Sequence, residues 1–242
     1  MSHTATRADV VIVALAELFR GDGEVLASPM GLLPALGARL ARLTFEPDLL
    51  LSDGEAFLLS ASGVVEGWQP FRRMLDTIVP HGRRHVVMGA NQLDRFGNQN
   101  ISAIGDHARP VRQLLGVRGA PGNTVNHRTS YWVPRHSKRV FVESVDVVSG
   151  VGYDNAAKAG LRFHDVHRVV TNLGVLDFSG PDHSMRLVSA HPGVAPSEVE
   201  DATSFALETA GAGVTREPSA AELALIREVL DPKSSREKEV PS

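Results

Sequence analysis

The stretch RHVVMGANQLDRFGNQN, Arg84 to Asn100, sets the expectation for the fold. A short, β-branched run over 84–88 is followed at once by side-chain amides. This order is typical of a buried parallel strand whose carboxyl end carries polar residues, the place where open α/β sheets bind ligands. Asn91 and Gln92 could donate hydrogen bonds to a carbonyl or an oxyanion there. The other polar residues of the stretch are better explained as turn formers: Asp94, Asn98 and Asn100.

Strand-like and helix-like segments alternate through the first half of the chain. We expect strands at 24–27, 48–51, 84–88 and 98–104, and helices at 8–20, 29–42 and 70–78. Thr6 and Asp9 have the spacing of a capping box, although the run VVIV also leaves a strand possible at 10–13. Such alternation favours an open, largely parallel α/β sheet with helices on both faces.

The second half of the chain has more closely spaced strand-like runs, which indicate a more antiparallel arrangement. They lie at 129–133, 139–148, 167–171, 175–178 and 185–189. Helices at 197–207 and 219–230 each begin with a Ser-x-x-Glu cap. We expect one domain over 1–230 and, over 231–242, a mobile tail that buries nothing.

The composition excludes several classes of function. The chain has 242 residues and a formal charge of −3, which disfavours nucleic acid as the main partner. It has no cysteine, which excludes disulfides and thiolate metal sites and fits a reducing cytoplasm. The apolar run VVIVALA at 10–16 is too short to span a membrane, so we expect a cytoplasmic protein.

A glycine-rich stretch, GVRGAPGN at 116–123, could bring backbone N–H groups close to a ligand. Alone it is more often a turn, and Pro121 removes one donor. Nearby arginines could hold phosphates: Arg109, Arg112 and Arg118.

Two histidine pairs have metal-like spacing but too few ligands to complete a coordination shell, so we expect no metal. They are His81 with His85, and His164 with His167. No G-x-S-x-G motif is present, which makes a serine triad improbable.

Acidic residues also interrupt an apolar stretch, PDLLLSDGEAFLLS at 47–60. The turn at 52–55 holds Asp53 and Glu55. It is either a polar turn between two core elements or a place where chemistry occurs.

Five segments in this order resemble the beta subunit of class I (glutaconate-type) CoA-transferases, and together they extend over most of the chain. The resemblance is greatest to the branch of ring-opening hydrolases in actinobacterial steroid degradation. The segments are GANQLDRFGNQNISAIGDHARPVR, GAPGN, HSKRVFVESVDVVSGVGY, VVTNLGVLDF and TREPSAAELALIREVLDP.

The resemblance implies a CoA-transferase fold, an obligate alpha subunit in a heterodimer or heterotetramer, and acyl-CoA substrates, with CoA as part of the substrate and no tightly bound cofactor. It assigns the CoA arm or the thioester oxyanion to the glycine-rich loop and its neighbours. These residues are Asn91, Arg118, Gly119, Ala120, Pro121, Gly122 and Asn123.

The resemblance also gives the turn at 52–55 a meaning. Transferases of the family carry a glutamate there, followed by a small residue and glycine, and it bears CoA covalently. Anchoring on Gly54 places Ser52 at the glutamate position, with Asp53 next to it. A transfer through a glutamate of this chain is therefore not expected.

The missing glutamate fits the steroid-degradation branch, and the resemblance to that branch implies hydrolysis of a carbon–carbon bond in a cyclic keto acyl-CoA. The main acid would come from the partner chain, with Ser52, Asp53 and Gln92 in supporting catalytic roles. One alternative is CoA transfer through Asp53 or Glu55, and another is a non-catalytic subunit that completes the partner's site. A sugar-phosphate isomerase would need a catalytic lysine paired with an acid. Neither Lys138 nor Lys158 has an evident acidic partner in the sequence.

Overall fold

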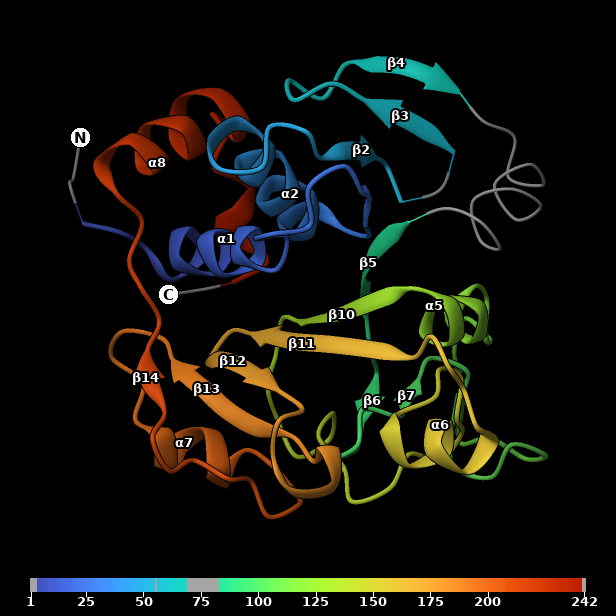
Figure 1. Ribbon diagram of the computed structural model, residues 1–242. Coiled ribbons are helices and arrows are strands. Elements are labelled where there is room, and N and C mark those ends of the chain that lie inside the picture. The colour runs from blue at the N-terminus through green and yellow to red at the C-terminus, as the bar shows by residue number, and fades with distance from the viewer. Residues whose placement is uncertain (1–3, 55, 69–82, 241–242) are drawn as a thin grey trace.

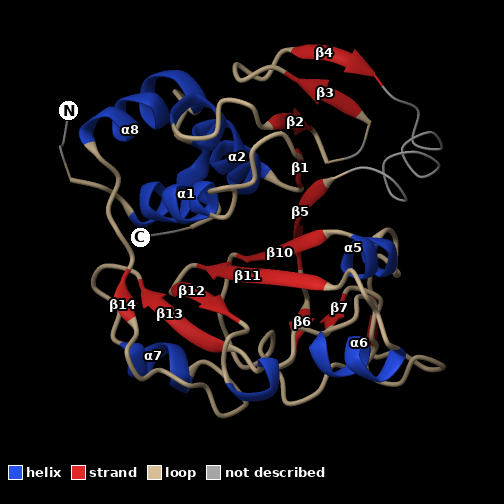
Figure 2. Ribbon diagram, in the orientation of Figure 1, coloured by secondary structure: helices blue, strands red, loops and turns tan. Residues whose placement is uncertain are grey.

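One large sheet passes through the described residues of the computed structural model, which are 4–54, 56–68 and 83–240 (Figure 1). In that part of the chain it has ten strands, in the order β14-β13-β12-β11-β10-β5-β1-β2-β3-β4. The helices lie in two groups on opposite sides of the sheet (Figure 2). The expected open α/β sheet with helices on both faces is confirmed.

The centre of the sheet is parallel. Five adjacent strands run in one direction: β2 (Leu50–Ser52), β1 (Leu26–Pro29), β5 (Arg84–Gly89), β10 (Arg128–Val133) and β11 (Asp165–Thr171). The first five residues of β5 are buried, as the apolar run predicts for a central strand.

Both flanks of the sheet contain antiparallel pairs. On the expected side, β11 pairs antiparallel with β12 (Gly174–Asp177), which pairs likewise with β13 (Arg186–Ala190). A short β14 (Gly213–Val214) then runs parallel to β13. At the other edge, an unpredicted β3 (Phe57–Leu59) and β4 (Val65–Trp68) extend the sheet antiparallel from β2.

Two hydrophobic clusters hold the helices to the sheet. On one side α1 (Arg7–Glu17) packs on α2 (Leu32–Thr44), and α2 contacts a π-helical turn (Leu225–Leu230) that continues α8 (Ala220–Ala224). The Thr6–Asp9 capping box forms, which explains why VVIV is helical. The predicted Ser219–Glu222 box also forms.

The second cluster lies beneath the other side of the sheet and includes residues that adjoin three short helices. These are α5 (Ala120–Asn126), α6 (Tyr153–Ala159) and α7 (Pro196–Asp201). None of the helices in the described part of the chain combines the length and hydrophobicity that a bilayer crossing requires.

Some local predictions are wrong. The run 139–148 forms turns instead of a strand, and 98–104 forms two short pieces, β7 (Gln99–Asn100) and β8 (Ala103–Ile104). They pair with β6 (Gln92–Leu93) and β9 (Arg112–Gln113) outside the main sheet. The 197–207 helix ends at Asp201, and its cap is made by Glu198 on the Ala195 N–H rather than by Ser197. The predicted helix at 70–78 lies outside the described residues.

The C-terminal residues also differ from the prediction, because 231–240 do not form a tail that buries nothing. Val240 lies in the first hydrophobic cluster, and Arg236 is only 3% exposed. Arg236 Nε donates to Asp9 Oδ1 over 2.8 Å, and Nη1 donates to Asp231 Oδ2 over 3.1 Å. The charges that suggested a mobile segment are satisfied by a carboxylate on α1 and by the segment itself.

Candidate functional site

The turn after β2 lies at the carboxyl edge of the parallel strands, against the end of β1. Gly54 has a φ of 88°, a left-handed conformation that favours glycine. A Cβ there would lie 3.1 Å from Pro29 O, so space also restricts the position. The glycine on which the resemblance was anchored is therefore required by the turn itself.

Ser52, at the expected glutamate position, is buried and holds this turn. Its Oγ donates to Ala27 O over 3.0 Å and accepts the Gly54 N–H over 3.2 Å. A second serine hydroxyl, Ser28 Oγ, lies 3.2 Å away. A side chain so engaged orients the turn and is not poised to attack a substrate.

Asp53 is exposed and closes the same turn on the other side. Its Oδ1 accepts the N–H groups of Ala56 over 2.9 Å and Phe57 over 3.0 Å. Ser52 is the buried last residue of β2, whereas Asp53 lies in the exposed turn that follows it. Glu55 lies outside the described residues.

Arg84 connects the turn with the glycine-rich segment, and sequence reasoning missed it. Its Nε donates to Ser28 Oγ over 2.7 Å, and its Nη1 donates to Asn123 Oδ1 over 2.9 Å. Burial lowers the pKa of Arg84 to about 10. A charged residue that opens an otherwise apolar strand was the available signal. Two predicted site residues, Ser52 and Asn123, are thus joined through one buried network.

The glycine-rich segment is the entrance to α5 rather than an open loop. Ala120 N donates to Val117 O over 3.0 Å, and Asn123 N donates to Gly119 O over 3.0 Å. Those two N–H groups are already occupied, and Pro121 has none. Gly119 and Pro121 are exposed, whereas Asn123 is 4% exposed and binds Arg84 through its side chain.

Neighbouring Arg118 is exposed and has a φ of 46°, the left-handed conformation in a residue other than glycine. It fixes the course of the chain just before α5.

The Gln92 side chain links β6 to the irregular segment around Asp146 by hydrogen bonds. Its Nε2 donates to Asp146 Oδ2 over 2.9 Å, and its Oε1 accepts from Asn100 Nδ2 over 2.6 Å and Asp146 N over 3.0 Å. The amide is buried and occupied at both ends, which favours a positioning role. Asn91, one residue earlier, is exposed and stands at the end of β5.

Two of the histidines considered as metal ligands, His85 and His164, make hydrogen bonds within the protein. His85 Nδ1 lies 2.6 Å from Asp22 Oδ2, and His164 Nδ1 lies 2.8 Å from Thr124 O. Burial lowers the pKa of His167 to about 4. Across the described ranges no three His, Cys, Asp or Glu residues gather as a metal site would need. His81 lies outside those ranges.

An isomerase would need a lysine paired with an acid, and of the two lysines considered, the described residues show such a pair only for Lys158, as an exposed contact one helical turn apart. Lys158 Nζ lies 3.2 Å from Asp154 within α6. Lys138 is exposed, and its backbone O accepts from Ser204 Oγ over 3.1 Å.

Comparison with known proteins extends over the whole chain. No protein-family model matches it. It is 59% identical over 254 residues to the cholesterol ring-cleaving hydrolase IpdB subunit of Rhodococcus jostii, covering 99% of both chains. A chain in the crystal structure of Rhodococcus jostii IpdAB superposes with a TM-score of 0.93 at 58% identity, covering 98% of this chain and 99% of that one.

A more distant relative is the corresponding subunit of glutaconate CoA-transferase from Acidaminococcus fermentans. It is 27% identical over 252 residues and covers 94% of this chain and 93% of its own length. The fold, the order of the sequence motifs and the full-length similarity agree. The chain belongs to the glutaconate-type CoA-transferase beta-subunit family, on the branch of the cholesterol ring-cleaving hydrolase IpdB subunits.

Proposed function

We propose that this chain is the beta-type subunit of a heteromeric hydrolase that opens a carbon ring in a steroid-derived keto acyl-CoA. The observation that carries the proposal is Ser52, buried and hydrogen-bonded at the position where transferases of the family have their glutamate. The full-length similarity to ring-cleaving hydrolase subunits supports the same interpretation. An alpha-type partner completes the enzyme.

The reaction is hydrolysis of a carbon–carbon bond next to a ketone. Water loses a proton to a base and its oxygen adds to the ring ketone. The bond between that carbon and the thioester α-carbon then breaks, and its electron pair forms the thioester enolate. A proton returns to the α-carbon, which leaves a carboxylate and an intact CoA thioester. A partner carboxylate serves as the base.

This chain supplies position and polarity. Ser52 and Asp53 shape the turn beside the substrate, and Gln92 fixes the residues that follow β5. The CoA arm is held by residues after the end of β5 and at the entrance to α5, and CoA enters only as part of the substrate. We assign contact with the CoA arm to Asn91, Arg118, Gly119, Pro121 and Gly122. Ala120 and Asn123 support these residues, because both are buried and their N–H groups are engaged. We assign the enzyme to the cytoplasm because its substrate is a CoA thioester.

The test is turnover by the co-expressed pair. The chain is produced with its alpha-type partner and given a cyclic keto acyl-CoA, and mass spectrometry follows the gain of one water. We expect turnover by the pair, none by this chain alone, and a loss of about tenfold or more in kcat for Ser52→Ala with Asp53→Ala. Exposed Ser197 and Asp201 on α7, both changed to Ala, are the matched control. Full activity of the Ser52/Asp53 double variant contradicts the assigned roles.

CoA transfer is the second candidate because Asp53 places a carboxylate one residue from the glutamate position and is exposed. Its Oδ1 is held by two backbone N–H groups, which lowers its availability as a nucleophile. Transfer requires a covalent acyl or CoA adduct on a carboxylate of this chain.

A further inference from the structure

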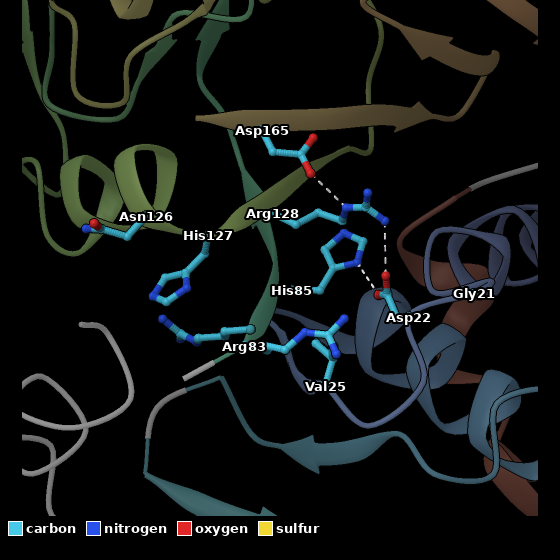
Figure 3. Close-up of a pocket in the computed structure, with 10 residues that line it drawn as sticks. Gly21, Asp22, Val25, Arg83, His85, Asn126, His127, Arg128 and Asp165 are labelled. Carbon is cyan, nitrogen blue, oxygen red and sulfur yellow. Dashed lines mark hydrogen bonds and ion pairs between the residues drawn. The ribbon is translucent and has the colours of Figure 1, made fainter. Parts of the chain in front are cut away.

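A pocket of about 370 Å³ opens at the amino-terminal edge of the parallel strands (Figure 3). Its walls come from Val25 just before β1 and from the first residues of three strands, Arg84, Arg128 and Asp165. Ser52 is the last residue of β2, so its turn lies at the carboxyl end of the parallel strands and the pocket lies at the opposite end.

The two carboxylates that line the pocket, Asp22 and Asp165, already have partners. Arg128 lies between two carboxylates, with Nη1 3.1 Å from Asp22 Oδ1 and Nε 2.9 Å from Asp165 Oδ2 (Figure 3). Asp22 also binds His85 Nδ1 over 2.6 Å. Both carboxylates therefore already have side-chain partners in the pocket.

The basic side is not balanced. Arg84 is 5% exposed and bonds only neutral oxygens, and its Nη2 makes no hydrogen bond with a described residue. Arg83 is exposed and forms no ion pair within the described part of the chain. Three arginines face two aspartates in this pocket, which leaves one net positive charge.

His127 adds a buried ring nitrogen without a partner. It is 3% exposed and lines the pocket, and its Nε2 makes no hydrogen bond to any described residue. Buried polar atoms in folded proteins are nearly always paired, so this one calls for a ligand or water. Figure 3 shows the ring on the opposite side of the pocket from Asp22. The unpaired His127 nitrogen therefore belongs to the wall that lies away from Asp22.

We propose that this pocket binds a phosphate group, held by His127 Nε2–H, Arg84 Nη2 and Arg83. The donors are of the kind that recognise phosphate oxygens. The two carboxylates of the pocket are already engaged by Arg128 and His85. Burial and the charge of Arg84 lower the pKa of His127 to about 4, so the neutral ring donates one N–H near pH 7. A bound anion raises that pKa.

The first test is calorimetry with inorganic phosphate on the complex of this chain with its alpha-type partner. We expect saturable one-site binding, weakened about tenfold or more by Arg83→Gln and by His127→Phe. Arg135→Gln is the matched control because Arg135 is exposed just beyond the opposite end of β10. Absence of binding to the complex, or a change below about twofold in both pocket variants, overturns the proposal.

The second test uses the histidine ring nitrogens, observed by ¹⁵N NMR. Phosphate should shift His127 Nε2 and leave His136 unmoved, since both His136 nitrogens are already bound, to Thr171 and Thr203. Equal shifts of the two rings, or none at His127, contradict the proposal.

A comparison of inorganic phosphate with adenosine 3′,5′-bisphosphate distinguishes a site for free phosphate from a site for a nucleotide phosphate ester. Tighter binding of the latter, abolished by Arg83→Gln, assigns the pocket to a nucleotide phosphate ester, whereas preference for the former assigns it to free phosphate. Binding is measured without turnover, so failure of this proposal and failure of the hydrolase assignment are distinguishable.

Discussion

Two arginines are almost equally buried in this protein and have opposite surroundings. Arg236 is 3% exposed and lies between Asp9 and Asp231, at 2.8 Å and 3.1 Å. Arg84 is 5% exposed, and among the described residues it meets only a serine hydroxyl and an amide oxygen. Removing charge from water is costly unless a counter-charge and hydrogen bonds replace the solvent.

The difference separates a buried charge with counter-charges beside it from one that has none among the described residues. The Arg236 cluster fastens the C-terminal segment to α1. Burial alone would raise the pKa of Asp9, yet the hydrogen bond from Arg227 and the charge of Arg236 hold it below its usual value. Arg84 lacks that compensation and joins the Ser52 turn to α5 while facing a pocket. Uncompensated buried charge is a mark of functional sites.

The largest expected effect on stability is at Arg236, the arginine that has counter-charges beside it. Asp9→Ala leaves Arg236 buried without its nearest partner, and we expect the free energy of unfolding to fall by about 3 to 5 kcal/mol. Urea unfolding of the purified protein measures it, with exposed Asp201→Ala as the control. A loss under about 1 kcal/mol would show that the cluster does not stabilise the fold.

The next effect concerns pH. The pKa of His127 is lowered from 6.5 to about 4, so the unfolded chain binds a proton that the folded chain does not. The free energy of unfolding is therefore unaffected by His127 above pH 6.5, and it decreases as the pH falls from about 6.5 to about 4. We expect His127→Phe to remove about 3 kcal/mol of this acid-induced loss of stability.

The same stability curves measured with added phosphate test whether the anion binds next to His127. Phosphate should reduce the acid loss of the wild-type chain and leave the His127→Phe curve unchanged. Buried His136, whose pKa lies near 3, provides the contrast because both its nitrogens are bonded and phosphate should not alter its contribution. Identical wild-type curves with and without phosphate would contradict the pocket assignment.

The smallest effect is expected at Arg84. Arg84→Met removes an uncompensated charge and keeps much of the side-chain volume, so the free energy of unfolding should change by no more than about 1 kcal/mol, in either direction. The same urea titration measures it beside Asp9→Ala. If both variants lose equal stability, the two arginines are equivalent and the distinction between them is wrong.

Much of the fold was predictable because local patterns agree with it. Alternating apolar runs predicted the parallel centre, and the boxes at Thr6 and Ser219 fixed two helix starts. The edge strands β3 and β4 were missed because they are short and mostly exposed, so they lack the apolar signal of a buried strand. The C-terminal segment was misjudged because its charges find a partner on α1, far away in the chain.

The site was predictable only in part. The resemblance located Ser52 and the glycine-rich segment, which the structure joins through Arg84. Neither the residue that joins them nor the occupation of Gln92 could be read from sequence, since Arg84 and Asn123 are 39 residues apart. Hydrogen bonds over such separations depend on the packed sheet.

The central claim is that this subunit contributes no attacking carboxylate. The direct measurement is to incubate the assembled pair with its acyl-CoA, add hydroxylamine or borohydride, and analyse this chain by peptide mass spectrometry. We predict no adduct on any of its carboxylates while turnover proceeds. A hydroxamate or reduced alcohol at Asp53 or Glu55 would contradict the account and identify the enzyme as a transferase.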